Sequence, residues 1–525
     1  MLGCAALPRH SIIQNMSNIS QVSRKVYRYL PVLAAGGLAL CLYTSTAAPW
    51  ITWANDGADG GDLIAAAMTW GVPHPSGYPT YCLLGRLFAV LPLGSVAQRF
   101  SLFSATMAAA AVGLVYLSTL RILTSVPGQE TWLDRTIALI VSLAFAASPT
   151  FWSQAIIAEV YAPLAFFFAV CLYLALRTDL LERACHWTIM GATFGLGLGM
   201  HLTLIWMLPG LALLLWSRAR PARLLALALG MLCGLSVYLY LPLAARGDPP
   251  INWGDPRTLS GFWWVISGKL YQGYLFALPA EHLLSRLGAW SRLWFQQYTW
   301  VGLALALTGL WSWLERGWRL WALATVLMFL IYGLYAITYD TTDSYVYLIP
   351  GFLLTALWMA EGAKAIIVSL GKQKTARALV ALGLVLLVGI PTWSLLSHYR
   401  ALDLSRDHAA AQWAEETLRQ LPEGAVLITG EDRHTFTLDY VRWVEGRRQD
   451  LVVIDGELLL QPWYADQLAR RYPSLREIGE RPSLEQLIGA NLDQRAIYLA
   501  SLREDLAQAF VLTPSGALWR ISGQR

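Results

Sequence analysis

Long apolar segments alternate with short polar ones over residues 29–397. The first apolar segment covers residues 29–50, and later ones cover 100–120 and 136–150. About twenty consecutive apolar residues suffice to cross the hydrocarbon core of a bilayer as a helix. The alternation therefore predicts a polytopic α-helical membrane protein with about eleven transmembrane helices.

Basic residues mark every second polar segment. Arg177 and Arg183 lie in one such segment, and Arg218 and Arg223 lie in the next. Cytoplasmic loops are enriched in lysine and arginine, so we assign these segments to the cytoplasm, together with the basic N-terminal segment 1–28. The intervening segments then face outward, and an odd number of crossings leaves the C-terminus outside. The prediction is a multi-pass integral membrane protein, of the plasma membrane if it is bacterial.

The pattern changes at residue 398, where charged residues become frequent and apolar residues no longer fill whole segments. Helical stretches now separate strand-like apolar runs, which lie at residues 425–429, 451–455 and 496–500. Alternating strands and helices are typical of an α/β fold. We therefore predict that residues 398–525 form an extracytoplasmic α/β domain that folds on its own.

Two acidic residues, Glu431 and Asp432, follow the first strand-like run. Open α/β sheets bind ligands at the carboxyl ends of their strands. For a lone acid pair, however, a solvated loop is the better interpretation.

Composition supports the membrane assignment and excludes other classes. Hydrophobic residues make up 56% of the chain and charged residues 14%, with a mean hydropathy of +0.46. The net charge of +5 does not indicate nucleic-acid binding. Most basic residues lie in short loops, where they mark the cytoplasmic side of the membrane. The six cysteines are scattered, so neither a disulfide framework nor a zinc site is predicted.

The densest candidate chemistry lies in the first outward loop, residues 51–99. Three carboxylates, Asp56, Asp59 and Asp62, lie among glycines and are followed by a turn that contains His74 and Tyr78. Glycines let a backbone approach a ligand closely, and the prolines of the turn restrict the end of the loop. A solvated acidic loop is the alternative. Further candidates on the same predicted face favour a site, namely Glu159 and His201.

A short apolar run at residues 81–92 follows this turn. It is too short to cross the bilayer and contains Arg86, so it is predicted to be an amphipathic helix on the outer membrane surface. The acids lie at the outer ends of helices, whereas a proton- or ion-coupled transporter usually places ionisable residues near the bilayer midplane. This distribution favours chemistry at the outer interface.

Four stretches of the chain together resemble a known family. They are DGGDLIAAAMTWGVPHPSGYPTYCLLGRLF, SPTFWSQAIIAEVYA, GLGLGMHLTL and YLYLPLAARGDPPINWGDPRTLSGFWW. In this order they are similar to the transmembrane O-mannosyltransferase-like family of the GT-C glycosyltransferases, over most of the membrane portion to about Tyr347. The chain has Asp62 where the family pattern D-x-G-E has glutamate.

The resemblance implies a GT-C fold, a polyprenyl-phosphate-sugar donor that enters from the bilayer, and an extracytoplasmic protein, lipid or glycan acceptor. It implies an inverting glycosyltransferase, with mannose as the sugar the family name suggests. The C-terminal α/β domain is expected to contribute to the choice of acceptor. A lipid or polysaccharide transporter with an external accessory domain is the main alternative, and a non-catalytic protein on a degenerate transferase scaffold is another.

Roles for the candidate residues follow from the same chemistry. Transfer to a hydroxyl needs a carboxylate base, for which Asp59 is the first candidate and Asp62 the second. The departing phosphate needs positive or hydrogen-bonding groups. Residues predicted to contact substrate are Asp56, His74, Tyr78, Glu159, Tyr161, His201, Arg246, Asn252, Trp253 and Arg257.

Plain structural roles compete with several of these assignments. Arg246 and Arg257 could be interfacial residues that extend toward the membrane surface. His74 could make a hydrogen bond within its turn, and Glu159 could cap a helix. Clustered carboxylates also bind Mg²⁺ or Mn²⁺, but the spacing here leaves metal dependence open.

Overall fold

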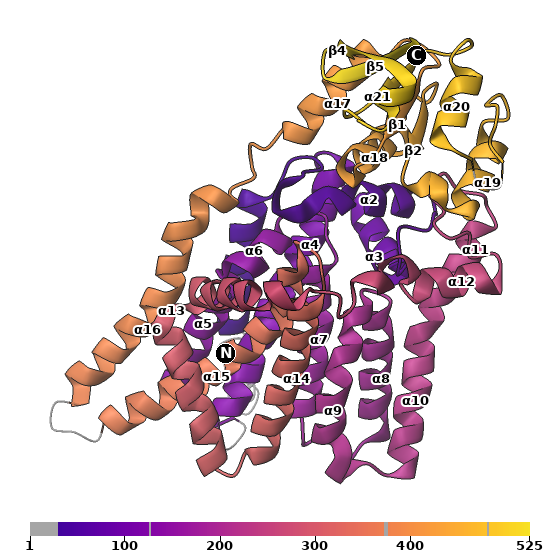
Figure 1. Cartoon of the computed structure of the whole chain (residues 1–525). Coiled ribbons are helices and arrows are strands. Elements are labelled where there is room, and N and C mark those ends of the chain that lie inside the picture. The colour runs from indigo at the N-terminus through magenta and orange to yellow at the C-terminus, as the bar shows by residue number, and fades with distance from the viewer. Residues whose placement is uncertain (1–29, 125–127, 372–375, 480–481) are drawn as a thin grey trace, which may run out of the picture.

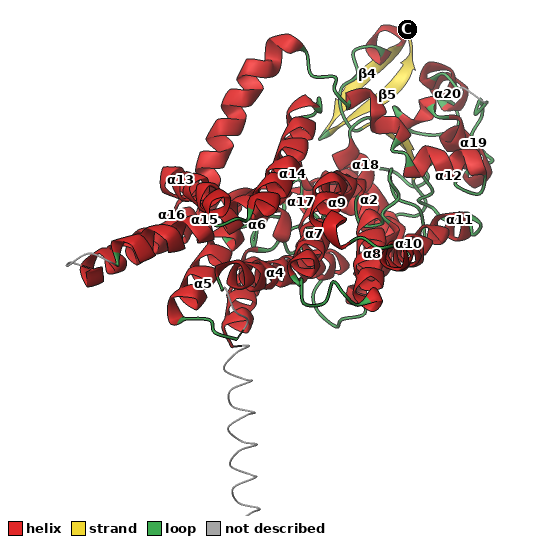
Figure 2. Ribbon diagram, turned by 90° about the horizontal axis from the view of Figure 1, so that it is seen from below, coloured by secondary structure: helices red, strands yellow, loops and turns green. Residues whose placement is uncertain are grey.

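The computed structural model describes residues 30–124, 128–371, 376–479 and 482–525. The predicted cytoplasmic segment 1–28 lies outside these residues. Helices dominate residues 30–402 and run side by side, and the C-terminal domain covers one end of them (Figure 1). Figure 2 shows many of the same helices nearly end-on, with the strands β4 and β5 to one side.

The helices of this membrane portion are Leu30–Thr46, α2 (Gly60–Met68), α3 (Pro79–Ala89), α4 (Val96–Leu123), α5 (Trp132–Ala146), α6 (Pro149–Ala155), α7 (Tyr161–Leu176), α8 (Ala184–Leu198), α9 (Leu208–Leu215), α10 (Pro221–Leu235), α11 (Tyr240–Ala245), α12 (Leu259–Ile266), α13 (Leu283–Glu315), α14 (Arg319–Thr338), α15 (Ile349–Leu370) and α16 (Ala376–Leu402). Short 3₁₀ turns link them, including η1 (Ala54–Asp59), η2 (Leu202–Met207), η5 (Lys269–Tyr274) and η7 (Ser344–Leu348).

Within the described residues, five helices are long and apolar enough to cross a membrane. A sixth crossing results if α5 and α6, which meet at a bend of 67°, form one broken span. The bend follows from Pro149, which lacks a backbone N–H and begins α6. Three shorter apolar helices accompany them. A multi-pass membrane protein is therefore confirmed, while the count of about eleven crossings stays a prediction.

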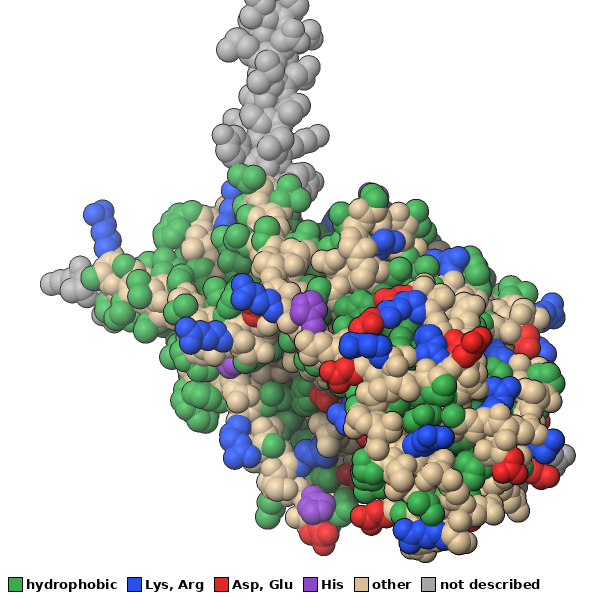
Figure 3. Space-filling view, turned by 90° about the horizontal axis from the view of Figure 1, so that it is seen from above, with side chains coloured by type: hydrophobic (Ala, Val, Ile, Leu, Met, Phe, Trp, Pro, Cys, Tyr) green, Lys and Arg blue, Asp and Glu red, His purple; other side chains and the backbone are tan. Residues whose placement is uncertain are grey.

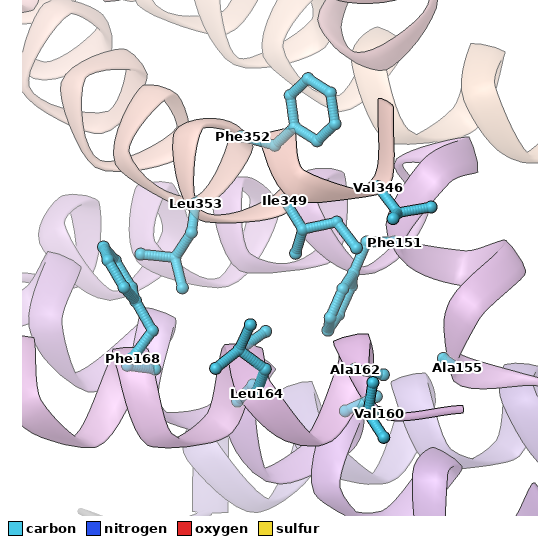
Figure 4. Close-up of a cluster of buried hydrophobic side chains, with 14 of the residues drawn as sticks. Phe151, Ala155, Val160, Ala162, Leu164, Phe168, Val346, Ile349, Phe352 and Leu353 are labelled. Atoms are coloured by element: carbon cyan, nitrogen blue, oxygen red, sulfur yellow. The ribbon is translucent and has the colours of Figure 1, made fainter. Parts of the chain in front are cut away.

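The membrane helices pack through large apolar side chains. In Figure 4, Phe151 of α6, Leu164 and Phe168 of α7, and Ile349 and Leu353 of α15 gather into one cluster. All five belong to the main hydrophobic core, and each is at most 4% exposed. The segment between α6 and α7, on which Glu159 lies, is buried in the same core, and Val160 at its end lies beside this cluster (Figure 4).

Leucines on the outer helices are exposed on the surface of the protein, as expected for residues that face lipid. Leu225 and Leu232 of α10 are 60% and 64% exposed. By contrast, charged side chains of both signs are mixed over much of the face seen from above (Figure 3). This division is the one expected for a membrane-embedded bundle with one end in water.

The C-terminal domain contains a five-stranded sheet. Its elements are α17 (Ala409–Gln420), β1 (Val426–Thr429), α18 (Asp432–Asp439), η8 (Tyr440–Val444), β2 (Val452–Asp455), α19 (Pro462–Arg471), α20 (Leu484–Asn491), β3 (Ile497–Leu499), α21 (Leu506–Ala509), β4 (Phe510–Ser515) and β5 (Leu518–Gln524). The strand order is β2-β1-β3-β5-β4. Strand β1 is parallel to β2 and β3, and β5 is antiparallel to β3 and β4. The three predicted strands are confirmed, and the β4–β5 hairpin is an addition.

The two faces of this sheet belong to different cores. Val426 and Ile428 of β1 pack into a core within the domain, whereas Leu427 between them joins the core of the membrane portion. Strands β2 and β3 divide in the same way, because successive side chains of a strand point to opposite faces. The predicted boundary at residues 397 and 398 lies inside α16. The domain therefore has its own core but is also continuous with the rest of the protein.

Contacts with the first outward loop seat the domain. Trp50 and Trp53 donate indole hydrogen bonds to Glu445 at 2.7 Å and Thr437 at 3.0 Å. Gly61 in α2 lies against the backbone of Phe436 in α18, so closely that a Cβ atom at residue 61 would collide with that backbone. A glycine is therefore required for α18 to approach α2.

Gly61→Ala is expected to loosen the domain, because overpacking against a rigid backbone costs about 1–3 kcal/mol. Thermal unfolding and limited proteolysis between residues 403 and 408 would measure the effect. Gly288→Ala is the matched control, because a Cβ there meets nothing within 4 Å. Equal unfolding temperatures and cleavage rates for the two variants would contradict the close approach.

Candidate active site

A cavity of about 510 Å³ opens between the membrane portion and the C-terminal domain. Such a volume is typical of a small-molecule site. Its walls come from the first outward loop, from η2, η5, α14 and η7, and from the start of α18. Polar and aromatic side chains that line it include Asp59, His74, Tyr78, Tyr161, His201, Tyr271, Tyr274, Tyr335, Tyr339, Asp343, Tyr347 and Asp432.

Asp62 is the buried anchor of this region, with no exposed surface. Its Oδ2 accepts hydrogen bonds from the backbone N–H of His74 at 2.9 Å and from His74 Nδ1 at 2.7 Å. Its Oδ1 accepts one from Trp253 Nε1 at 3.0 Å. Both carboxylate oxygens thus accept hydrogen bonds, and Asp62 does not line the cavity.

Asp59 differs from Asp62 in that it faces the cavity. Its side chain is 38% exposed, and its Oδ2 lies 3.4 Å from His74 Nε2. His74 therefore stands between the two carboxylates and contacts each through a different ring nitrogen. Of the two predicted bases, Asp59 is the one that lines the cavity.

The three groups alter one another's pKa values. Burial disfavours the charged form of His74, but Asp59 and the hydrogen bond to Asp62 outweigh it and raise its pKa to about 9. Burial also raises the pKa of Asp59, against the opposing effect of His74, and the neighbouring Asp62 and Asp343 raise it further. His74 is therefore protonated at neutral pH, and Asp59 takes up a proton more readily than an exposed aspartate does.

Local structure explains why the histidine is rigid. The segment that carries Trp253 pairs with the turn, since Val72 N–H donates to Ile251 O at 2.8 Å and Trp253 N–H donates to Val72 O at 3.0 Å. The ring of His74 also stacks on Phe436 of the C-terminal domain, with the planes 12° apart. Contacts from three distant parts of the chain thus orient one imidazole.

Asp432 brings the C-terminal domain into the site. It begins α18 and lines the cavity together with Asp59. Burial and the nearby Asp59 raise its pKa to about 7. Asp432 as a residue remains exposed to solvent, so the predicted solvated loop is not contradicted, and docking of α18 on α2 places this residue at the cavity as well. Glu431 instead forms an ion pair with Arg433 at 2.6 Å.

Aromatic rings form a continuous wall of the cavity. His201 lies against Tyr78, Tyr161 and Tyr347, with ring centroids 5.4–5.9 Å apart. Its Nδ1 accepts a hydrogen bond from the backbone N–H of Thr203 at 3.2 Å. Tyr78 and Tyr161 were predicted from the sequence, whereas Tyr347 was not. Asp343 was also missed as a site residue, although its place in an outward acidic loop was a usable signal.

Glu159 lies beside the site but does not line the cavity. It is 2% exposed, and its Oε2 accepts a hydrogen bond from the backbone N–H of Val160 at 3.0 Å, just before α7 begins. Burial and the neighbouring Asp59 raise its pKa well above the usual range. This hydrogen bond involves the residue before the helix, and α7 has no side-chain cap, so the contact is not a helix cap.

Several predicted contact residues lie outside the cavity. Asp56 is exposed and accepts a hydrogen bond from Tyr345 at 2.7 Å. Arg246 is exposed, Arg257 pairs with Asp255, and Asn252 donates to the same aspartate at 3.2 Å. Among the described lining residues there is no lysine or arginine. The predicted contact of Arg246 and Arg257 with a phosphate therefore has no support from the cavity.

Within the described ranges, no group of three histidine, cysteine, aspartate or glutamate side chains is arranged to hold a metal ion. The carboxylates that line the cavity, Asp59, Asp343 and Asp432, are spread over three elements. A divalent ion such as Mg²⁺ or Mn²⁺ stays an open expectation.

Comparison with known proteins agrees with this architecture. Residues 59–224 match the model of the protein O-mannosyl-transferase TMEM260 N-terminal domain, and residues 410–480 match TMEM260-associated domain 2. These two stretches are thus similar to domains of the TMEM260 proteins. The mouse protein O-mannosyl-transferase TMEM260 is 26% identical over 81% of this chain and 63% of its own length. The Dictyostelium discoideum protein of the same name is 22% identical over 87% and 62%. The chain thus spans less than two thirds of these TMEM260 relatives.

A solved structure shares the fold. The crystal structure of ArnT from Cupriavidus metallidurans bound to undecaprenyl phosphate aligns with a TM-score of 0.53, over 94% of this chain and 97% of that one. At 12% identity, this likeness concerns the fold alone. The predicted GT-C-like fold with a C-terminal α/β region is confirmed.

Proposed function

We propose that this protein is an inverting membrane glycosyltransferase that transfers a sugar from a polyprenyl phosphate to an extracytoplasmic acceptor. The main support is Asp59, a carboxylate with a raised pKa that faces a cavity at the end of the membrane helices. The names of the TMEM260 relatives favour mannose as the sugar and a protein hydroxyl as the acceptor. In this proposal the N-terminus is cytoplasmic and the cavity opens on the other side.

The reaction needs one base and one leaving group. The acceptor oxygen attacks the anomeric carbon of the sugar, a new carbon–oxygen bond forms, and the bond to the phosphate oxygen breaks. The electron pair leaves with the polyprenyl phosphate. Asp59 takes the hydroxyl proton, which its raised pKa favours, and charged His74 holds the carboxylate in place.

The leaving phosphate requires hydrogen-bond donors. Because the described lining residues include no lysine or arginine, tyrosine hydroxyls are the main candidates, from η5, α14 and η7. The same rings offer apolar faces on which a sugar can stack. Asp432 is the group of the C-terminal domain best placed to meet the acceptor.

Replacing the base tests the proposal directly. Asp59→Asn keeps the size of the side chain but removes the proton acceptor, so sugar transfer should fall by about a hundredfold or more with little change in donor binding. The measurement is transfer by purified protein from a panel of polyprenyl-phosphate sugars. Asp56→Asn is the matched control and should stay near the wild-type rate. Absence of transfer by the wild type, or near-normal transfer by Asp59→Asn, would refute the proposal.

The pH dependence should respond to a neighbouring charge. Asp59 must be ionised to accept a proton, so kcat/KM should rise with pH as Asp59 loses its proton. Asp343 raises the pKa of Asp59, and Asp343→Asn removes that negative charge. The acid limb of the profile should therefore move to lower pH. An unchanged limb, or one that moves to higher pH, would contradict the assignment of Asp59 as the base.

A further inference from the structure

A second, smaller cavity lies where the segment Pro250–Trp253 meets the C-terminal domain. Its volume is about 50 Å³, and it shares no lining residue with the catalytic cavity. The walls come from α18, η8, β2 and α19 in addition to that segment. At about 10–15 Å³ for each water molecule, it has room for a few waters or one small ion.

Four polar atoms without a partner belong to residues that line this cavity. Arg442, Gln467 and Asn252 line it and are 2%, 5% and 1% exposed. Arg442 Nε, Gln467 Nε2 and Asn252 Oδ1 make no hydrogen bond, nor does Nε1 of Trp463, which lines the same cavity. Buried polar groups in folded proteins are nearly always hydrogen-bonded. Three unpaired N–H groups in one cavity therefore indicate an occupant that accepts hydrogen bonds.

The charges around the cavity are predominantly positive. Arg442 and Arg471 line it, opposite a single carboxyl group, that of Asp439. Burial raises the pKa of Asp439 to about 7, against the opposing effect of Arg442. Within the described residues neither arginine forms an ion pair. A buried guanidinium without a counter-charge is unfavourable, so a negative occupant is preferred over water.

The guanidinium groups of Arg442 and Arg471 already donate hydrogen bonds within the protein, but Nε of Arg442 remains unpaired. Nη2 of Arg442 donates to Leu451 O at 2.8 Å and to the hydroxyl of Tyr472 at 2.6 Å, so its Nε–H remains for a ligand. Arg471 donates to the carbonyls of Pro250 and Pro249 at 2.8 and 2.9 Å. The arginines are thus held in place whether or not an ion is bound, as a preformed site requires.

We propose that this cavity binds a small oxyanion of the size of inorganic phosphate. The ion would accept hydrogen bonds from Arg442 Nε, Trp463 Nε1 and Gln467 Nε2, and it would link η8 and α19. Trp253 forms part of the same wall and donates to Asp62, so the site adjoins the anchor of the catalytic region. Occupancy would stabilise the seating of the C-terminal domain, independently of the transfer reaction.

Thermal unfolding of the purified full chain, titrated with inorganic phosphate at constant ionic strength, tests the proposal. The midpoint should rise with phosphate and saturate, because a ligand that binds only the folded state stabilises it. Trp463→Phe and Gln467→Leu each remove one donor and should weaken the apparent affinity at least tenfold. Two variants are used because Arg442 is too buried for its replacement to be safe for folding.

The double variant Tyr335→Phe/Tyr347→Phe is the control that separates this site from the catalytic cavity, because it removes two hydroxyls proposed to bind phosphate there. It should respond to phosphate like the wild type. A wild-type midpoint that does not respond to phosphate would overturn the proposal. So would a response that survives unchanged in both Trp463→Phe and Gln467→Leu, or one that Tyr335→Phe/Tyr347→Phe abolishes.

Discussion

The buried carboxylate of Asp62 is the interaction on which the candidate active site depends. A carboxylate without contact with water is costly unless its oxygens are hydrogen-bonded, and here three donors satisfy it. Two of them belong to His74 and the third to Trp253. Because the donors lie on different segments, satisfying Asp62 closes the turn, draws in the segment around Trp253 and directs the imidazole toward Asp59. The reactive carboxylate is thus held by a buried one.

The seating of the C-terminal domain follows from the same region. Ala65 and Ala66 of α2, Ile251, Trp253 and Phe436 form a small hydrophobic core that joins α2, the Trp253 segment and α18. Phe436 covers His74, and Asp432 four residues earlier reaches the cavity. The domain is therefore not a separate module appended to a complete membrane enzyme. Among the described residues it contributes Asp432 to the lining of the cavity, and Phe436 shields His74 from water, which strengthens the interaction of His74 with Asp59.

The sequence predicted what depends on local pattern. The pattern of apolar residues predicted the membrane helices, the helix after the turn and three strands. The density of carboxylates identified the acidic loop as the candidate site. Other features depend on contacts between distant residues. Whether Asp59 or Asp62 is the free carboxylate depends on Trp253, which is 191 residues from Asp62. Asp432 becomes a cavity residue only because Gly61 admits α18, Arg257 pairs with Asp255, and Arg246 is exposed outside the cavity. The β4–β5 hairpin was missed because its side chains are largely exposed and lack a clear apolar period.

The most direct test of a site shared between the two parts of the chain is the kinetics of Asp432→Asn, with Glu431→Gln as the matched control. The substitution keeps size but removes a charge within the cavity. A hydrogen bond to a charged group contributes about 1.5–3 kcal/mol, so kcat/KM for the acceptor should fall about tenfold to a hundredfold while donor binding is retained. Glu431→Gln, which loses contacts with Arg433 and His434 and does not line the cavity, should behave like the wild type. An Asp432→Asn protein that transfers sugar as well as the wild type at every acceptor concentration would contradict the shared site.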